Sequence, residues 1–214
     1  MKIITDEEAF AVKSFEKRIP LRREGYNFEF TRRWFLHRNL TTWSTFLPDR
    51  FPFGSVKMVQ IGVFEGMDLI WCLQNILCDA RSKVWAIDPW LPTTKLNADT
   101  MEAVCNRAQK NLSYWKEKVK IRRGLSAEIL PSLTTGQFDL VVIDGDHNTD
   151  PVYFDALQAF RLLKPGGWMI FDDVRNRLPK KDHVVDGMRR FVDEHEGKVK
   201  LEWQHRYCDC YSKL

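Results

Sequence analysis

Short apolar runs alternate with amphipathic stretches from residue 56 almost to the C-terminal end of the sequence. Short runs are typical of buried strands, whereas apolar positions three and four residues apart are typical of helices. The predicted strands are 56–61, 83–87, 119–122, 138–143, 168–171, 199–204 and 206–212, and the predicted helices are 68–77, 101–118, 152–163 and 184–195. This order predicts an α/β fold, a Rossmann-like, doubly wound, mostly parallel seven-stranded sheet with helices on both faces.

Residues 1–53 have a different character, because they are rich in aromatic and basic side chains. Four aromatic residues have the spacing of one apolar helix face: Trp34, Phe35, Trp43 and Phe46. Pro48 and Pro52, followed by Gly54, predict the end of that helix. We therefore predict an N-terminal helical segment, residues 1–53, and a domain of residues 54–214. The segment is expected to form a lid or a subunit contact of a homo-oligomer, and the sequence leaves both open.

Charge and cysteine content narrow the class of protein. A net charge of +4 is only mildly basic, which argues against an obligate nucleic-acid binder. The five cysteines are odd in number and show no C-x-x-C spacing, so reduced thiols in a cytoplasmic protein are the simplest account. No apolar run reaches the roughly 18 residues that a membrane span needs, so no membrane association is expected.

Glycine and aspartate stand at the ends of the predicted strands. Parallel α/β sheets bind ligands at the carboxyl ends of their strands, where strand order reverses. Gly62 and Gly66 flank a turn between a strand and a helix, where missing side chains let the backbone bend and a ligand approach closely. Asp88 ends the next strand, where an acid can accept hydrogen bonds from ribose hydroxyls. The alternative for the two glycines is an ordinary tight turn. The alternative for Asp88 is an exposed residue that starts a turn with Pro89.

Four segments together resemble a known family. They are IGVFEG at 61–66, AID at 86–88, VIDGDH at 142–147 and LKPGGWMIFDD at 163–173. In this order they resemble class I methyltransferases that use S-adenosylmethionine (SAM). They are most similar to the bacterial methyltransferase domain 24 group, with its I-D-G-[DS]-H motif and late F-D-D, which includes macrocin-type sugar O-methyltransferases. The resemblance covers about residues 34–190.

The resemblance implies a SAM site in this chain. The implied cofactor residues are Gln60, Gly62, Glu65, Gly66, Asp88, Leu125, Ser126 and Asp144. The glycine turn would hold the methionine end, Asp88 the ribose, and the two residues after the third strand the adenine. Gln60 is a departure, because the family usually carries an acid there. An amide can form hydrogen bonds, but it cannot pair as an ion with the methionyl ammonium.

Four aspartates follow two strands that are neighbours in this fold, so their carboxylates can converge. Such acids repel one another unless a cation or a shared proton neutralises them, and hard oxygen ligands suit Mg²⁺ or Ca²⁺. The resemblance to metal-dependent O-methyltransferases implies Asp144, Asp172 and Asp173 as ligands of a divalent cation and Asp146 as the general base. His147 is a second candidate base, since its ordinary pKa suits proton abstraction. The alternatives are that Asp172 and Asp173 cap the following segment and that Asp144 only positions SAM. His147 could likewise hydrogen-bond the backbone and hold the loop.

We therefore expect a SAM-dependent methyltransferase that O-methylates a small hydroxylated acceptor, for which a sugar is one candidate, with a divalent cation as a candidate helper. A nucleic-acid methyltransferase is the first alternative, but residues 144–147 replace the N/D-P-P-Y/F motif that stacks on a flipped base. A non-catalytic SAM-binding protein, in which Gln60 marks decay, is the second. An NAD-binding Rossmann protein is the third.

Overall fold

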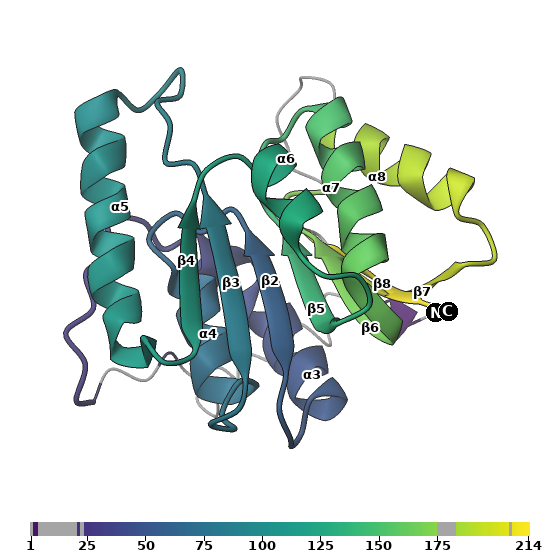
Figure 1. Cartoon of the computed structure of the whole chain (residues 1–214), viewed down its shortest axis with the longest axis horizontal. Coiled ribbons are helices and arrows are strands. Elements are labelled where there is room, and N and C mark those ends of the chain that lie inside the picture. Colours follow the sequence, from purple (N-terminus) through teal and green to yellow (C-terminus); the bar gives the residue numbers. More distant parts are fainter. Residues whose placement is uncertain (1, 4–20, 22–23, 175–182, 206) are drawn as a thin grey trace.

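The computed structural model describes residues 2–3, 21, 24–174, 183–205 and 207–214. Its strands are β1 (Lys2–Ile3), β2 (Lys57–Ile61), β3 (Lys83–Asp88), β4 (Val119–Arg123), β5 (Phe138–Ile143), β6 (Leu163–Phe171), β7 (Val199–Gln204) and β8 (Asp209–Lys213). They form one sheet in the order β1-β7-β8-β6-β5-β2-β3-β4 (Figure 1). Only β8 runs antiparallel to its neighbours. The Rossmann-like, mostly parallel sheet of seven strands is confirmed, and the short β1 adds an edge to it.

The described helices are α2 (Trp34–Arg38), α3 (Leu40–Arg50), α4 (Met67–Asn75), α5 (Ala98–Leu112), α6 (Ser126–Ile129), α7 (Thr149–Leu162) and α8 (His183–Glu194), with 3-10 turns at Ser113–Trp115 and Leu130–Ser132. The predicted end of the N-terminal helix is confirmed, because α3 ends at Arg50, between Pro48 and Pro52, although Pro48 itself lies inside the helix. A proline removes one helix hydrogen bond, but the buried Trp43 and Leu47 hold this helix in the core. The predicted helix 101–118 starts earlier, since the Asn97 side chain accepts from the Thr100 N–H and caps α5.

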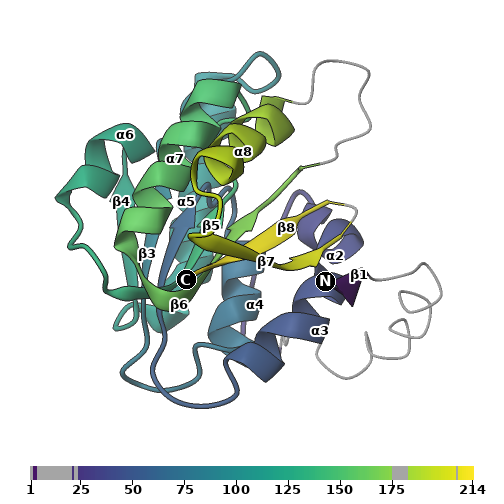
Figure 2. The ribbon, with the colours of Figure 1, turned by 90° about the vertical axis from the view of Figure 1, so that its right-hand side faces the viewer.

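Side chains alternate between the two faces of the sheet, as the strand period of two requires. Met58, Val84 and Val142 pack on one face in the cluster that contains residues of α3, α4 and α5. Val59 and Val141 point the other way, into the cluster formed with α7 and α8. Figures 1 and 2 show these two helix layers on opposite sides of the strands. Among the described residues, no helix is long and apolar enough to cross a bilayer.

The described part of the N-terminal segment packs into this core. Trp43 is fully buried and contacts Trp71 of α4, with ring centroids 6.2 Å apart. Phe46 stacks on Trp203 of β7 at 5.2 Å. Residues 34–50 therefore share one hydrophobic core with the sheet. The division at residue 53, the lid and the subunit contact stay predictions. Residues 1, 4–20 and 22–23 of the segment lie outside the described part of the chain. The first residue of the predicted strand 206–212 also lies outside it.

Strand register brings the predicted functional positions to one edge. Ile61 pairs with Ile87 of β3 and with Ile143 of β5, and Ile143 pairs with Phe171 of β6. The next residues are Gly62, Asp88, Asp144 and Asp172. Strand order reverses between β2 and β5, the point at which such sheets bind ligands.

Candidate functional site

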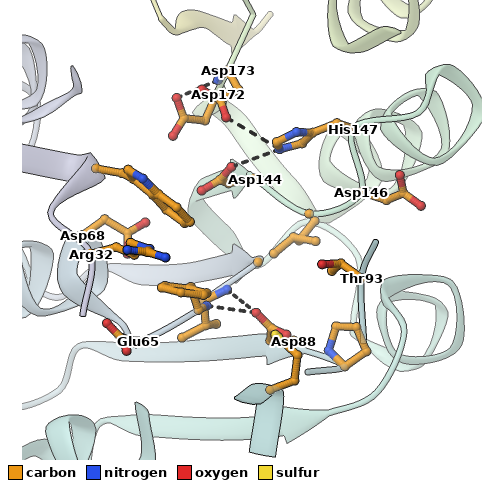
Figure 3. A pocket seen from close by; sticks show the side chains of 18 of the residues that line it. Arg32, Glu65, Asp68, Asp88, Thr93, Asp144, Asp146, His147, Asp172 and Asp173 are labelled. Atoms are coloured by element: carbon orange, nitrogen blue, oxygen red, sulfur yellow. Dashed lines mark hydrogen bonds and ion pairs between the residues drawn. The ribbon is translucent and has the colours of Figure 1, made fainter. Parts of the chain in front are cut away.

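A cavity of about 770 Å³ opens at this edge of the sheet. Its floor is formed by the residues that follow β2, β3, β4, β5 and β6, and its wall includes Phe30, Arg32 and Trp34 of the N-terminal segment (Figure 3). Ten predicted site residues line it: Gly62, Glu65, Asp88, Leu125, Ser126, Asp144, Asp146, His147, Asp172 and Asp173. Gln60 and Gly66 do not line it: Gln60 lies buried in β2, and Gly66 is the N-cap residue before α4.

Gly62 is required by close backbone packing. Its φ is +80°, and a Cβ at this position would lie 1.8 Å from the carbonyl oxygen of Asp144. Two hydrogen bonds fix the contact, from Gly62 N–H to the Ile87 carbonyl and from Asp144 N–H to the Ile61 carbonyl, both 2.9 Å. The glycine therefore lets the backbone after β2 pack directly against the backbone after β5, at the edge where both line the cavity.

Asp88 holds the glycine turn in place. Its Oδ2 accepts the N–H groups of Val63 and Phe64 at 2.8 and 2.9 Å, and its Oδ1 accepts the N–H of Trp90 at 2.7 Å. The Trp90 indole in turn donates to the Phe64 carbonyl at 2.9 Å. Asp88 is only 9% exposed, so the reading as an exposed turn residue is wrong. The ribose contact of Asp88 stays a prediction. The carboxylate that would make this contact is already held in place by these hydrogen bonds.

Glu65 anchors the N-terminal segment. Its carboxylate accepts the N–H and the hydroxyl of Thr31 at 2.7 and 2.8 Å and the Arg107 guanidinium at 3.2 Å. Asn111 extends the anchor by donating to the carbonyls of Glu65 and Glu29. Glu65 is 2% exposed. The predicted contact of Glu65 with the cofactor stays a prediction, and its observed partners are protein groups.

Two residues that sequence reasoning missed orient the late aspartates. Arg38 Nη1 lies 2.6 Å from Asp173 Oδ1, and Asn39 Nδ2 donates to Asp172 Oδ2 at 2.6 Å. The other oxygen of Asp172, Oδ1, accepts the Asp173 N–H at 2.7 Å. Both oxygens of Asp172 are thus engaged by protein donors. No local signal marks Arg38 or Asn39, because their partners are more than 130 residues away in the sequence.

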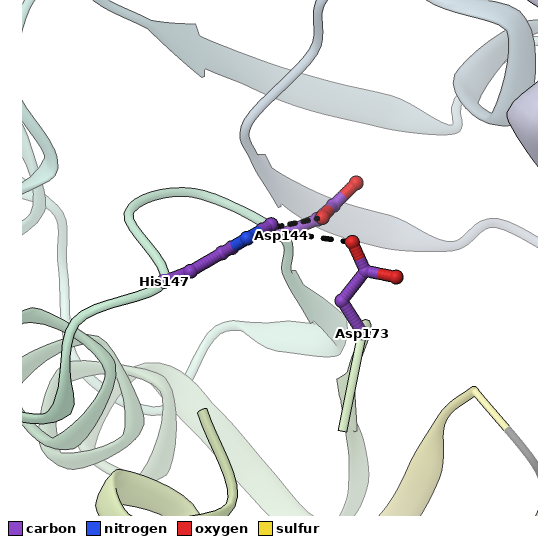
Figure 4. A group of neighbouring side chains, drawn as sticks. All are labelled: Asp144, His147 and Asp173. Carbon is purple, nitrogen blue, oxygen red and sulfur yellow. Dashed lines mark ion pairs between the residues drawn. The ribbon is translucent and has the colours of Figure 1, made fainter. Parts of the chain in front are cut away.

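The side chains that do converge are Asp144, His147 and Asp173 (Figure 4). His147 Nε2 lies 3.7 Å from Asp144 Oδ1 and 3.8 Å from Asp173 Oδ2. Partial desolvation raises the pKa of Asp144 well above its usual range, and the charge of Asp173 adds to the shift. The pKa of Asp172 is raised by burial and by these two neighbours. The cluster differs from the predicted ligand set, because His147 takes the place of Asp172.

Asp146, the first candidate base, turns away from this cluster. Its Oδ1 accepts the backbone N–H of Asn148 at 2.9 Å and the Asn148 side-chain amide at 2.7 Å. Figure 3 shows its carboxylate on the far side of the loop from Asp144. Of the two candidate bases, His147 lies nearer to the other acids, and the assignment of either stays a prediction.

Sequence reasoning missed a buried acid, Asp155, which lies next to the loop that carries Asp146. It is 1% exposed on α7, and its Oδ1 has no hydrogen-bond partner among the described residues. Burial raises its pKa to about 7, although a hydrogen bond from the Ser126 side chain opposes the shift. A carboxyl group with a raised pKa favours folding when protonated, so native stability falls as pH rises from about 4 to about 7.

We expect Asp155→Asn to raise the free energy of unfolding by about 2 kcal/mol at pH 8, within the limit of roughly 4 kcal/mol that a shift of about three pKa units allows. The gain should vanish near pH 4, where Asp155 is protonated in both states. Thermal or urea unfolding at the two pH values measures it. The exposed Asp193→Asn serves as the control and should change stability little at either pH. Equal effects of Asp155→Asn at pH 4 and pH 8 would contradict the assignment.

Comparison with known proteins agrees with this architecture. A family model described as a methyltransferase domain matches residues 59–174, more than half of the chain. An uncharacterized protein of Acanthamoeba polyphaga mimivirus is 24% identical over 168 residues, which cover 77% of this chain and 72% of that protein.

Several solved structures share the fold. A Klebsiella pneumoniae protein to which O-methyltransferase activity is ascribed is 20% identical, with a TM-score of 0.61 over 98% of this chain and 96% of that one. The O-methyltransferase of Bacillus cereus, solved with S-adenosylhomocysteine (SAH), is 23% identical, with a TM-score of 0.53 over 97% and 90%. TomG of Streptomyces achromogenes, solved with SAM, is 21% identical, with a TM-score of 0.55 over 75% and 74%.

The family match spans the glycine turn, Asp88 and the acidic strand ends, which are the positions that the sheet gathers around the cavity. The chain therefore belongs to this family of methyltransferase domains and is a class I, SAM-dependent methyltransferase.

Proposed function

We propose that this methyltransferase acts on a hydroxyl group of a small molecule, for which a sugar is one candidate. One observation carries the proposal. The glycine turn at Gly62 and the titratable cluster that contains Asp144 and His147 line the same cavity. The volume of this cavity, about 770 Å³, falls within the range of roughly 300–1,000 Å³ for small-molecule sites. The O-methyltransferases among the structural neighbours support oxygen as the acceptor atom.

The residues at the glycine turn fit the cofactor. Gly62 and Asp88 both line the cavity, and the glycine turn is held against the Asp144 backbone, where a Cβ at position 62 would lie. Gly62 and Asp88 would hold the methionine and ribose parts, and Leu125 and Ser126 the adenine. Bound SAM supplies an electrophilic methyl group on its sulfonium. The contribution of the chain is to orient the acceptor oxygen and to exclude water, which is worth several kcal/mol of the barrier.

The acidic cluster is proposed to act on the acceptor hydroxyl. His147 Nε2 lies 3.7 Å from Asp144 and 3.8 Å from Asp173 on the cavity wall, where it can accept the proton of an acceptor hydroxyl. The same three groups could hold a divalent cation, which would lower the pKa of the hydroxyl. Arg38 would then orient Asp173 through its hydrogen bond, as groups around metal ligands commonly do.

The test is transfer of a labelled methyl group from SAM to a panel of small hydroxylated compounds, with RNA and DNA as further arms. We expect turnover with a small acceptor and SAH as the second product. If the cation has a role, EDTA should lower turnover by about 10–100-fold and Mg²⁺ should restore it. Turnover unaffected by EDTA would remove the cation from the proposal. Transfer only to nucleic acid would refute the small acceptor, and SAM binding without transfer to any acceptor would favour a non-catalytic protein.

A further inference from the structure

Gln60 and Asp68 form a hydrogen-bonded pair beneath the glycine turn. Gln60 Nε2 donates to Asp68 Oδ2 at 2.7 Å and to the Gly62 carbonyl at 3.0 Å. Gln60 is fully buried, and its Oε1 has no hydrogen-bond partner among the described residues. The amide nitrogen thus points at Asp68, and this fixes the orientation of the carboxylate.

Asp68 reaches the cavity and Gln60 does not. Asp68 lies in the first turn of α4 and lines the cavity on the side where Figure 3 shows it with Glu65. Its Oδ1 accepts the N–H of Leu69 at 2.7 Å. Within the described part of the chain, no ion pair joins Asp68 to a cationic side chain. The carboxylate is therefore held rigidly at the cavity without a salt bridge from the described residues.

An unpaired carboxylate in such a place is costly. Loss of hydration is the largest influence on Asp68 and raises its pKa to about 6, even though hydrogen bonds from the Leu69 backbone and from Gln60 favour the ionised form. A cationic ligand group would remove this penalty and form a charge-assisted hydrogen bond. The amino-acid part of SAM carries such a group, a primary ammonium.

We infer that Asp68 provides the carboxylate that pairs with the methionyl ammonium of SAM. Related methyltransferases usually carry an acid at the position of Gln60, and here the negative charge lies one hydrogen bond away, on α4. Gln60 acts as the positioning residue that orients it. The inference rests on SAM binding in this cavity, and it explains how the chain can recognise the ammonium although position 60 is an amide.

The test compares two ligands that differ only in the ammonium: SAH and its deaminated analogue, in which hydrogen replaces the amino group. Calorimetry at pH 8, two units above the pKa of Asp68, keeps the carboxylate ionised. The wild-type protein should bind SAH at least 10-fold more tightly than the analogue. Asp68→Asn should weaken SAH binding by roughly 10–100-fold, the usual range for a charged hydrogen bond, and leave the affinity for the analogue within about twofold.

Two further variants separate charge recognition from structural damage. Asp99→Asn, in the first turn of α5 and outside the cavity, is the matched control and should change neither affinity. Gln60→Leu removes the amide that orients Asp68 and should lower the preference for SAH over the analogue without abolishing it. Unfolding measurements should show no loss of stability in Asp68→Asn, because the change removes a desolvated charge.

The possible contrary results are distinct. Equal losses for SAH and for the analogue, or no loss for either, would overturn the role of Asp68 while SAM binding stands. A loss with SAM but not with SAH would assign Asp68 to the sulfonium and overturn the inference. A wild-type protein that binds neither SAM nor SAH would overturn the proposed function as well.

Discussion

Gly62→Ala is expected to abolish both the stable fold and SAM binding. The added Cβ would lie 1.8 Å from the Asp144 carbonyl oxygen and 2.4 Å from its carbonyl carbon, and neither atom can move without breaking the contact between β2 and β5. The positive φ adds backbone strain. We expect a loss of at least about 4 kcal/mol, which is a large part of the roughly 5–15 kcal/mol by which domains are stable. Soluble yield and denaturant unfolding measure it.

Gly136→Ala is the matched control for this prediction. Gly136 also has a positive φ, +66°, but nothing lies within 4 Å of the Cβ that would be added. It should therefore show the backbone strain alone, about 1–2 kcal/mol, with SAM affinity unchanged. If the two alanine variants lose the same stability, close packing at Gly62 is not the reason for the glycine.

Asp88→Ala should give the second largest effect, a loss of about 3–5 kcal/mol in stability together with a fall of more than 100-fold in affinity for SAH. The change leaves the N–H groups of Val63, Phe64 and Trp90 without their acceptor, and each such buried donor costs roughly 1–3 kcal/mol. The glycine turn then loses its fixed shape, so the cradle for the cofactor is lost even in molecules that fold.

Asp88→Asn separates the two roles of this side chain. The amide keeps one oxygen as an acceptor, so we expect a smaller loss of stability than in the alanine variant and a clear loss of SAH affinity. Unfolding curves and calorimetry on the same samples measure both quantities. An alanine variant as stable as the wild type would show that the three hydrogen bonds do not hold the turn.

The central strands and their functional ends were predictable from local patterns. Strands buried on both faces read as continuous apolar runs, and a glycine or an aspartate ends each of them. The glycine turn, Asp88 and Asp144 could therefore be placed at one edge before any contact was known. The resemblance of the motifs to SAM-dependent methyltransferases added the cofactor, and the family match confirmed the methyltransferase class.

Helix boundaries were less predictable, because packing overrides local signals. Pro48 is a strong helix breaker, yet the burial of Trp43 and Leu47 keeps α3 continuous around it. The same burial explains why the aromatic spacing of the N-terminal segment predicted a helix but not the residues that this helix packs against. A periodic apolar face predicts that something covers it, but not what.

The sequence by itself determined the sheet, the strand ends and the cofactor class, because these follow from periodicity and motif order along the chain. Only the tertiary structure decided which polar groups meet: Arg38 with Asp173, Thr31 with Glu65, His147 with the acids, and Asp68 at the cavity. Apart from the close pair of Asp144 and His147, these arrangements join distant parts of the chain. Hydrogen bonds and ion pairs act over a few ångströms in space, and no local pattern encodes which distant segments come that close.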